Sequence, residues 1–361
     1  MIKLLIIAPD FNFSSGVTRH VLILLDLLSS VSNIETHLLV NGGDAVTSIK
    51  NQSQLKLNVY PFSNSKTSLI KHIRFFVFLT KYCKENKIDI IHTHHRYPEL
   101  VAYFVSKNIK VKTITTAHSF VNGMKYLSFK SDLIIAVSDA VKKHIISNYP
   151  ASEKKIIKQY NCIDIRFYEY SNHQQDGKNI FFIKNDCQKI FLYAGRISFA
   201  KGSDLLIESF IKLTDDYKNI CLILIGDLYD KQVFDKFRYH NQVKFFKTQK
   251  NIGSFLKKAD FIVLPSLAES FPYLMLEAGI YKKLFIGSQI GGIEEFIEDG
   301  VNGLLFKPAD VSDLNTKMKF ALDNQDLVND MAIRLEVKVK ENCSPSKYFN
   351  ALLEIYNKMV N

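Results

Sequence analysis

Short runs of apolar, β-prone residues alternate with segments of helical period along almost the whole chain, and this alternation restricts the possible fold more than any other feature. The strands expected first are Lys3–Ala8, Thr36–Val40, Leu57–Phe62, Asp89–Thr93, Lys112–Ala117, Leu133–Ser138 and Ile156–Tyr160, with amphipathic helices such as Val17–Ser29 and Ser68–Lys84 between them. Because several strands are apolar at nearly every position, we expect parallel sheets that are covered by helices on both faces.

The alternation breaks at residues 166–186, where the sequence RFYEYSNHQQDGKNIFFIKND is polar and lacks a period. Strands resume at Lys189–Ala194, Cys221–Ile225, Val243–Phe246, Phe261–Pro265 and Leu284–Gly287. A chain of 361 residues has the length of two domains. We therefore predict two Rossmann-like, doubly wound α/β domains at 1–165 and 187–344, a linker at 166–186, and an amphipathic helix at 345–361.

The charge of the chain indicates which kinds of partner it binds, and its cysteines indicate the cellular compartment. The chain has 47 Lys and Arg against 36 Asp and Glu, and its net charge of +11 favours anionic partners such as phosphorylated ligands or acidic lipids. Five scattered cysteines without a CxxC pair predict neither a disulfide framework nor a zinc ribbon, which fits a reducing cytosol. The first apolar run is too short for a signal peptide, and no segment reaches the ~18 apolar residues of a membrane span.

Two carboxylates flank a helix start in the segment Leu264–Gly279, LPSLAESFPYLMLEAG. Glu269 falls in the loop after a strand, and Glu277 lies in the helix that starts near Pro272. Backbone amides at such a helix N-terminus favour an anion, so the segment can hold a phosphate and present carboxylates to nearby hydroxyls. The alternative is that both glutamates are solvated charges at the helix end.

A basic segment, Tyr193–Gly202 (YAGRISFAKG), has a similar position after the first strand of the second domain. Arg196 follows this strand directly, and Lys201 comes shortly before a helix at Asp204–Leu213. A guanidinium fork and a compact ammonium can together bind a diphosphate, whereas the alternative is an ordinary basic surface loop. The segment matches neither the GxGxxG fingerprint nor the Walker A pattern.

These segments together resemble the retaining glycosyltransferases of family 4, which have the GT-B fold, and the resemblance covers nearly the whole chain. The family's E-x7-E pattern corresponds to Glu269 and Glu277. The family's G-R…K-G element corresponds to Gly195, Arg196, Lys201 and Gly202, and its G-G…E…D-G…G element corresponds to IGGIEEFIEDGVNGLLF. The loop SSGVTRHV with Gly16 is similar to the family's phosphate-facing glycine loop. TITTAHSF places His118 at a strand end, where the family has a cleft histidine. The chain departs from the family at Ser15 and Leu228, where a second glycine is usual.

The resemblance implies two domains that face a central cleft, with the C-terminal helix returning to the first domain. It implies that Arg196 and Lys201 bind the diphosphate of a nucleotide sugar, that Glu277 binds the ribose, that Glu269 orients the sugar, and that His118 lines the reaction centre. The expected catalytic residues are His118, Glu269, Arg196 and Lys201, and the expected donor-binding residues are Gly16, Gly195, Arg196, Lys201, Glu269, Ser270, Phe271, Pro272 and Glu277. No metal and no other cofactor is expected, because charged side chains and helix termini can replace a metal electrostatically.

Two further segments keep more than one interpretation. The segment IIHTHHRYPEL places His92, His94 and His95 around a strand end. A metal cluster is the least favoured interpretation. The other two are that His94 and Arg96 bind the acceptor, and that these are ordinary core or surface histidines. The basic segment Lys66–Lys87 predicts an amphipathic helix that either lies on an anionic membrane or packs its apolar face on the sheet.

We therefore expect a retaining hexosyltransferase in the cytoplasm, peripheral on the inner face of the membrane, that builds a bacterial surface polysaccharide, lipopolysaccharide or capsule. The donor is expected to be a UDP-hexose or UDP-N-acetylhexosamine first and GDP-mannose second, and the acceptor a glycan or lipid-linked glycan. Nucleic acid is not an expected partner. The alternatives are a sugar-nucleotide epimerase of the same fold, a glycosidase that uses the two carboxylates, and a non-catalytic partner subunit.

Overall fold

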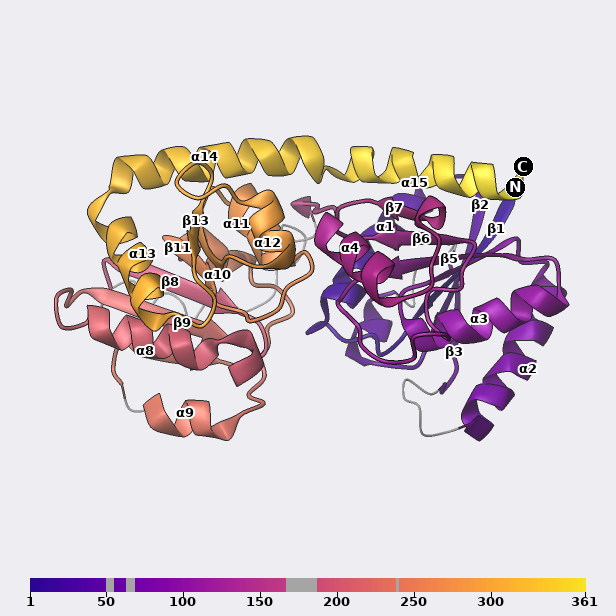
Figure 1. Cartoon of the computed structure of the whole chain (residues 1–361), viewed down its shortest axis with the longest axis horizontal. Helices are drawn as coiled ribbons and strands as arrows, with labels where there is room; N and C mark the ends of the chain where they lie inside the picture. Colours follow the sequence, from indigo (N-terminus) through magenta and orange to yellow (C-terminus); the bar gives the residue numbers. More distant parts are fainter. Residues whose placement is uncertain (50–54, 63–68, 167–186, 238–239) are drawn as a thin grey trace. The chain divides into compact units, whose positions relative to one another are not determined.

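The computed structural model describes residues 1–49, 55–62, 69–166, 187–237 and 240–361. These residues form two compact units, one of Met1–Cys162 with Pro345–Asn361 and one of Ile163–Ser344. Each unit contains a parallel sheet with helices around it, which confirms the α/β prediction (Figure 1). Residues 167–186 of the expected linker and residues 66–68 of the expected basic helix lie outside the described residues.

Within the described residues, the first unit has a seven-stranded sheet in the order β3-β2-β1-β4-β5-β6-β7. Its strands are β1 (Ile2–Ala8), β2 (Ile34–Val40), β3 (Leu55–Val59), β4 (Ile90–Thr93), β5 (Lys112–Ala117), β6 (Leu133–Ala136) and β7 (Ile156–Lys158). Its helices are α1 (Gly16–Ser29), η1 (Asp44–Ser48), α2 (Leu69–Asn86), α3 (Arg96–Asn108), α4 (Asp139–Asn148), η2 (Glu153–Lys155) and α15 (Pro345–Val360). The strand order reverses between β1 and β4, so their connections leave in opposite directions and open a crevice at the carboxyl ends.

The central strand β1 shows why the sequence folds in this way. Its residues Leu4, Leu5, Ile6 and Ile7 are completely buried, because helices cover both faces of the sheet. β1 pairs in parallel with β2 on one side and with β4 on the other. The continuous apolar run in the sequence therefore marks the middle of the sheet.

The C-terminal helix α15 is packed into the first unit. Its Tyr356 is completely buried, and the Oη atom of Tyr356 lies 2.8 Å from Nδ1 of His92 at the end of β4. Gln159, just after β7, donates a hydrogen bond from Nε2 to the carbonyl oxygen of Tyr348. The last residues of the chain thus complete a core that the first residues begin.

In the described part of the second unit, a six-stranded parallel sheet has the order β10-β9-β8-β11-β12-β13. Its strands are β8 (Lys189–Ala194), β9 (Ile220–Ile225), β10 (Val243–Phe246), β11 (Phe261–Leu264), β12 (Leu284–Ser288) and β13 (Leu304–Phe306). Its helices are η4 (Phe199–Lys201), α8 (Ser203–Leu213), α9 (Lys231–Phe237), α10 (Gly253–Lys258), α11 (Tyr273–Ile280), α12 (Gly291–Phe296), α13 (Val311–Asp323) and α14 (Gln325–Asn342). The order reverses between β8 and β11, which places the crevice of this sheet beside those two strands.

Two features differ from what the sequence pattern predicts. Strand β13 was not expected, because three residues are too few to establish a period. In α2, the core is contacted by Phe75 and Leu79, whereas Leu69 and Ile73 are 72% and 54% exposed. The apolar face of α2 is therefore only partly covered by the sheet.

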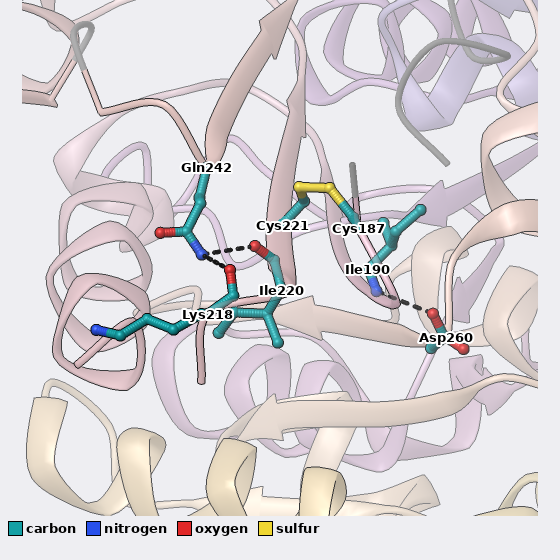
Figure 2. The surroundings of a disulfide bond; sticks show 7 residues. All are labelled: Cys187, Ile190, Lys218, Ile220, Cys221, Gln242 and Asp260. Atoms are coloured by element: carbon teal, nitrogen blue, oxygen red, sulfur yellow. Dashed lines mark hydrogen bonds between the residues drawn. A yellow bond between two sulfur atoms is a disulfide. The ribbon is translucent and has the colours of Figure 1, made fainter. Parts of the chain in front are cut away.

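A disulfide bond joins Cys187, just before β8, to Cys221 in β9 (Figure 2). The sequence analysis predicts no disulfide framework, and this bond corrects that prediction for one pair, because spacing along the chain does not reveal that neighbouring strands bring two cysteines together. At the same edge of the sheet, Gln242 donates hydrogen bonds from Nε2 to the carbonyl oxygens of Lys218 and Ile220. The bond lies at the amino ends of the strands, opposite the carboxyl ends where the crevice opens.

The disulfide can be tested by counting thiols. Alkylation of the denatured, unreduced chain should label only the three cysteines outside the disulfide, Cys83, Cys162 and Cys343, and reduction should raise the count to five. The double variant Cys187→Ser/Cys221→Ser should lower the free energy of unfolding by about 4 kcal/mol, the chain-entropy value for a bond across 34 residues. Five labelled thiols before reduction would contradict the bond.

Candidate functional site

The loops after β8 and β11 meet at the crevice of the second unit. The loop after β8 carries Arg196 and Lys201, and the loop after β11 carries Glu269. The Lys201 Nζ atom forms an ion pair with Oε1 of Glu269 at 2.5 Å, and Ser266 donates a hydrogen bond to the same oxygen at 2.9 Å. The two motifs, which the sequence places 68 residues apart, therefore form one charged site.

Backbone contacts hold these two loops against each other. Gly202 has a left-handed φ of +64°, and a Cβ atom at this position would lie 2.1 Å from the carbonyl oxygen of Pro265. The N–H of Leu267 donates to the carbonyl oxygen of Ala200 at 3.3 Å. The Gly202 that the sequence motif contains is thus required both by its φ and by the close approach of the second loop.

A third loop supports the segment after Glu269. The N–H of Gly292, at the start of α12, donates to the Glu269 carbonyl oxygen at 3.2 Å. A Cβ atom on Gly292 would lie 1.8 Å from the carbonyl oxygen of Ser270. The conformation around Glu269 and Ser270 is therefore set by backbone packing on the Gly291-Gly292 pair that the sequence motif contains.

The remaining donor-site candidates of the second unit differ in exposure. Glu277 in α11 is 1% exposed and Glu269 has a side chain that is 13% exposed, so neither glutamate is a solvated helix-end charge. Pro272 is the N-cap of α11, and Phe271 before it is buried. These residues place the start of α11 directly beside the charged pair.

Arg196 and Gly195 lie at the exposed rim of the same crevice. The Arg196 guanidinium lies over the Tyr229 ring, 5.5 Å from its centroid, and the Arg196 carbonyl accepts a hydrogen bond from the Tyr193 hydroxyl at 2.6 Å. The backbone of Arg196 is therefore fixed while its charge faces solvent.

In the first unit, the sequence candidates also lie around the crevice. Gly16 is the first residue of α1, whose N-cap is Ser15, and it is exposed. His118 follows β5 and is half-buried, whereas His94 follows β4 and is only 2% exposed. Arg96 begins α3 and donates from Nη1 to the carbonyl oxygen of Asn122 at 2.7 Å.

The histidines group differently from the expected set of His92, His94 and His95. His94 Nδ1 lies 3.0 Å from His118 Nε2, and His20 of α1 packs against both rings, with centroid distances of 5.3 Å and 4.7 Å. His92 also packs against His94, with a centroid distance of 4.5 Å, while its own ring nitrogens contact Tyr356 and Thr116. Sequence reasoning missed His20, although its position in the helix after β1, the neighbour of β4, was a usable signal.

Burial lowers the pKa of all three clustered imidazoles, in His20 to about 4 and in His94 and His118 well below the usual value. Repulsion from the neighbouring rings lowers the pKa of His94 and His118 further. The three rings are therefore neutral near pH 7, so each has one ring nitrogen that donates a hydrogen bond and one that accepts.

The loop that begins at His118 is anchored by Glu99 of α3, which the sequence analysis did not single out. Oε2 of Glu99 accepts from the N–H of Phe129, and Oε1 accepts from the N–H groups of Lys130 and Ser131. Burial outweighs these hydrogen bonds and raises the pKa of Glu99 to about 7. A buried carboxyl thus holds the far end of the loop that carries His118 at its start.

Two family models match the chain, Glycosyltransferase Family 4 over residues 14–167 and Glycosyl transferases group 1 over residues 176–336. An uncharacterised glycosyltransferase from Methanocaldococcus jannaschii is 25% identical over 91% of this chain and 90% of its own length. A lipopolysaccharide 1,2-N-acetylglucosaminetransferase from Salmonella typhimurium is 30% identical over 47% of each chain. A protein from Anabaena, solved in complex with UDP-glucose, has a TM-score of 0.82 with 18% identity and covers 99% of this chain and 100% of its own.

The contact between the two loops predicts different effects of alanine at two glycines. Gly202→Ala and Gly300→Ala both place a Cβ atom at a left-handed φ, but the space around Gly300 is open. Because Gly202→Ala also forces Pro265 away, it should destabilise the second unit by about 1–3 kcal/mol more than Gly300→Ala, measured by urea unfolding. Equal losses in the two variants would show that the loops are not in close contact.

Proposed function

Because the chain belongs to glycosyltransferase family 4, we propose that it transfers a sugar from a nucleotide-diphosphate donor to a glycan or lipid-linked acceptor. The donor that we propose is a UDP-hexose or UDP-N-acetylhexosamine, with GDP-mannose as the second choice. The observation that carries this proposal is the Lys201–Glu269 pair, which stands at the crevice of the second unit with Arg196 on the same loop. The named activity of the Salmonella relative and the UDP-glucose in the Anabaena structure support it.

In the proposed reaction, the Lys201 ammonium forms an ion pair with the donor diphosphate in place of its ion pair with Glu269. Arg196 adds a guanidinium fork, and both cations stabilise the negative charge that grows on the departing phosphate. The Glu269 carboxylate, released from Lys201, accepts hydrogen bonds from the sugar hydroxyls. Glu277 accepts hydrogen bonds from the ribose, and the start of α11 with Ser270, Phe271 and Pro272 contributes to the phosphate site.

The proposed transfer retains the anomeric configuration and needs neither a metal nor another cofactor. The bond between the anomeric carbon and the phosphate oxygen breaks, and the acceptor oxygen bonds to that carbon on the same face. The acceptor proton passes to the departing phosphate oxygen, so atoms and charge balance without a protein nucleophile. His118 and Gly16 of the first unit assist the donor, and His94 and Arg96 are proposed to act on the acceptor side.

Removing either cation should slow the reaction strongly. Lys201→Ala and Arg196→Ala are each expected to lower kcat by about 10²–10³-fold, the cost of one preorganised group that stabilises transition-state charge. Lys212→Ala is a matched control, because Lys212 is an exposed cation of α8 in an ion pair with Glu208. Nucleotide release with an added acceptor measures the rate. Near-normal kcat in both site variants would remove the diphosphate assignment.

Retention can be tested independently of the residues involved. With an α-linked nucleotide sugar, the product should show the small anomeric proton coupling of an α-linkage from the first turnovers, followed by NMR. A β-linked product would refute the retaining mechanism. Turnover of the donor to an epimer without any acceptor would favour the epimerase alternative instead.

We further propose that α2 docks the protein on the inner, anionic face of the cytoplasmic membrane. Four apolar side chains of this helix are more than half exposed, namely Leu69, Ile70, Ile73 and Val77. Exposed Lys71, Arg74, Lys81 and Lys84 lie on the same helix. Exposed apolar side chains next to basic ones suit an interfacial helix. None of the helices in the described residues has the length and hydropathy needed to span a bilayer.

The double variant Ile70→Ser/Ile73→Ser should therefore weaken sedimentation with anionic vesicles. Leu327→Ser/Ile333→Ser is the matched control, because it removes two side chains of α14 that are 51% exposed. Binding by the parent protein should also fall as salt rises above 0.15 M, where screening acts within about 8 Å. If neutral and anionic vesicles bind equally, or if both double variants lose binding equally, α2 is not the docking helix.

A further inference from the structure

The loop between β5 and β6 begins at His118, and one helix holds it at two places. Arg96, at the start of α3, donates to the carbonyl oxygen of Asn122 at 2.7 Å. Glu99, three residues later on the same face of α3, binds the other end of the loop at Lys130. A single turn of α3 therefore fixes both halves of the loop.

The contact at the far end of the loop needs an ionised carboxyl group. Glu99 is 0% exposed, and its Oε2 accepts from the N–H of Phe129 at 3.1 Å. Its Oε1 accepts from the N–H of Lys130 at 2.5 Å and from the N–H and hydroxyl of Ser131 at 2.9 Å and 3.2 Å. A carboxylate offers lone pairs at both oxygens, whereas a protonated carboxyl has one O–H donor and accepts more weakly. The loop is therefore held most firmly when Glu99 is ionised.

Phe129 connects this contact to the start of the loop. Its φ of +59° is left-handed, which costs free energy in a residue with a Cβ atom and persists only where the surroundings hold it. Its ring packs edge to face against Tyr149, with the centroids 4.8 Å apart. The Tyr149 hydroxyl donates to the carbonyl oxygen of Val121 at 2.6 Å. A continuous series of contacts thus runs from Glu99 to the backbone three residues after His118.

We propose that Glu99 is a positioning residue for His118, which its ionised carboxylate holds in place through Phe129 and Tyr149. The proposal rests on the proposed function, which puts His118 beside the donor. Protonation of Glu99 loosens the loop and slows the transfer without changing the charged site of the second unit.

The elements packed against α3 and the loop carry other titratable side chains, namely His72 on α2, His92 on β4, Lys112 on β5, Lys130 and Asp132 in the loop, and His144 on α4. Burial raises the pKa of Glu99 to about 7, and its own hydrogen bonds oppose that shift. Lys130 takes part through its backbone N–H. Burial keeps the pKa of His118 well below the usual value, so this ring stays neutral while Glu99 titrates.

Stability and catalytic rate should respond to pH in opposite directions. Because burial raises the pKa of Glu99 from 4.5 to about 7, its contribution to stability is full below pH 4.5 and is lost as pH rises through 7. Relative to Glu99→Gln, the folding equilibrium constant of the parent should fall by up to about 300-fold over that range. Over the same range the ionised carboxylate binds the loop and kcat rises. A residue with a structural role alone would move both quantities together.

The test follows, by NMR through pH 7, the amide resonances of the three residues that Glu99 binds and the ring resonance of His118. In the parent, all of them should shift with one midpoint near pH 7, and Glu99→Gln should abolish this step. Glu99→Gln should also lower kcat at pH 8 by about 10-fold, remove the pH step from kcat, and leave the donor KM within about twofold, because the donor site lies in the second unit.

Tyr149→Phe separates the two ends of the loop. It leaves the contacts of Glu99 in place, so the amide resonances should titrate as in the parent. It removes the hydroxyl that contacts Val121, so the His118 ring should no longer follow the midpoint and kcat should fall by about 2–10-fold. Glu153→Gln is the matched control, because this side chain is 68% exposed in an ion pair with Lys142, and it should behave like the parent.

Three results would overturn the proposal: amide resonances without a step near pH 7, a His118 ring that still titrates in a folded Glu99→Gln variant, or a parent kcat that falls together with stability as pH rises. Circular dichroism and a thermal melt establish folding. If Glu99→Gln does not fold, the parent titration and Tyr149→Phe decide. If the folded parent transfers no sugar, the proposed function fails, whereas a midpoint shared by the amides and the His118 ring still supports the positioning.

Discussion

The candidate site of the second unit depends on the pairing of β8 with β11. Their paired residues Phe191 and Phe261 are 70 positions apart in the sequence. Parallel strands end at one edge of a sheet, so the loops that follow neighbouring strands must meet there. The reversal of strand order between β8 and β11 keeps a helix from filling the space above that junction. Lys201 and Glu269 are then brought within ion-pair distance by the backbone contact between Gly202 and Pro265, not by flexible side chains alone.

The same topology gives different chemistry in the two units. In the first unit, the crevice beside β1 and β4 contains buried imidazoles whose lowered pKa keeps them uncharged. In the second unit, it contains an ammonium, a carboxylate and a guanidinium. Neutral imidazoles can exchange hydrogen bonds with a hydroxyl, whereas opposite charges suit an exchange with an anion. The fold therefore supplies the position, and a few side chains decide what binds.

Much of this architecture could be predicted from the sequence, since buried parallel strands such as β1 and β9 are long apolar runs with clear ends. The loop residues Arg196, Lys201 and Glu269 could also be found, because they directly follow such strands. Contacts between distant segments could not be found: the pairing of Cys187 with Cys221, the approach of His20 to His94, and the Glu99 anchor depend on the order of strands in the sheet. The exposure of Ile73 was also hidden, because helical period shows which residues share a face but not how far the sheet extends beneath them.

The packing of α15 has a consequence for how the protein is made. Tyr356 and the His92 that it contacts are 264 residues apart, which a ribosome takes about 10–50 s to add. During that interval the second unit can already form its own core, while the first unit still has an open face where Leu352 and Tyr356 will be buried. Although its first strand is synthesised before the second unit, the first unit is therefore the last of the two to be finished, and its uncovered face stays open to chaperones until α15 has been made.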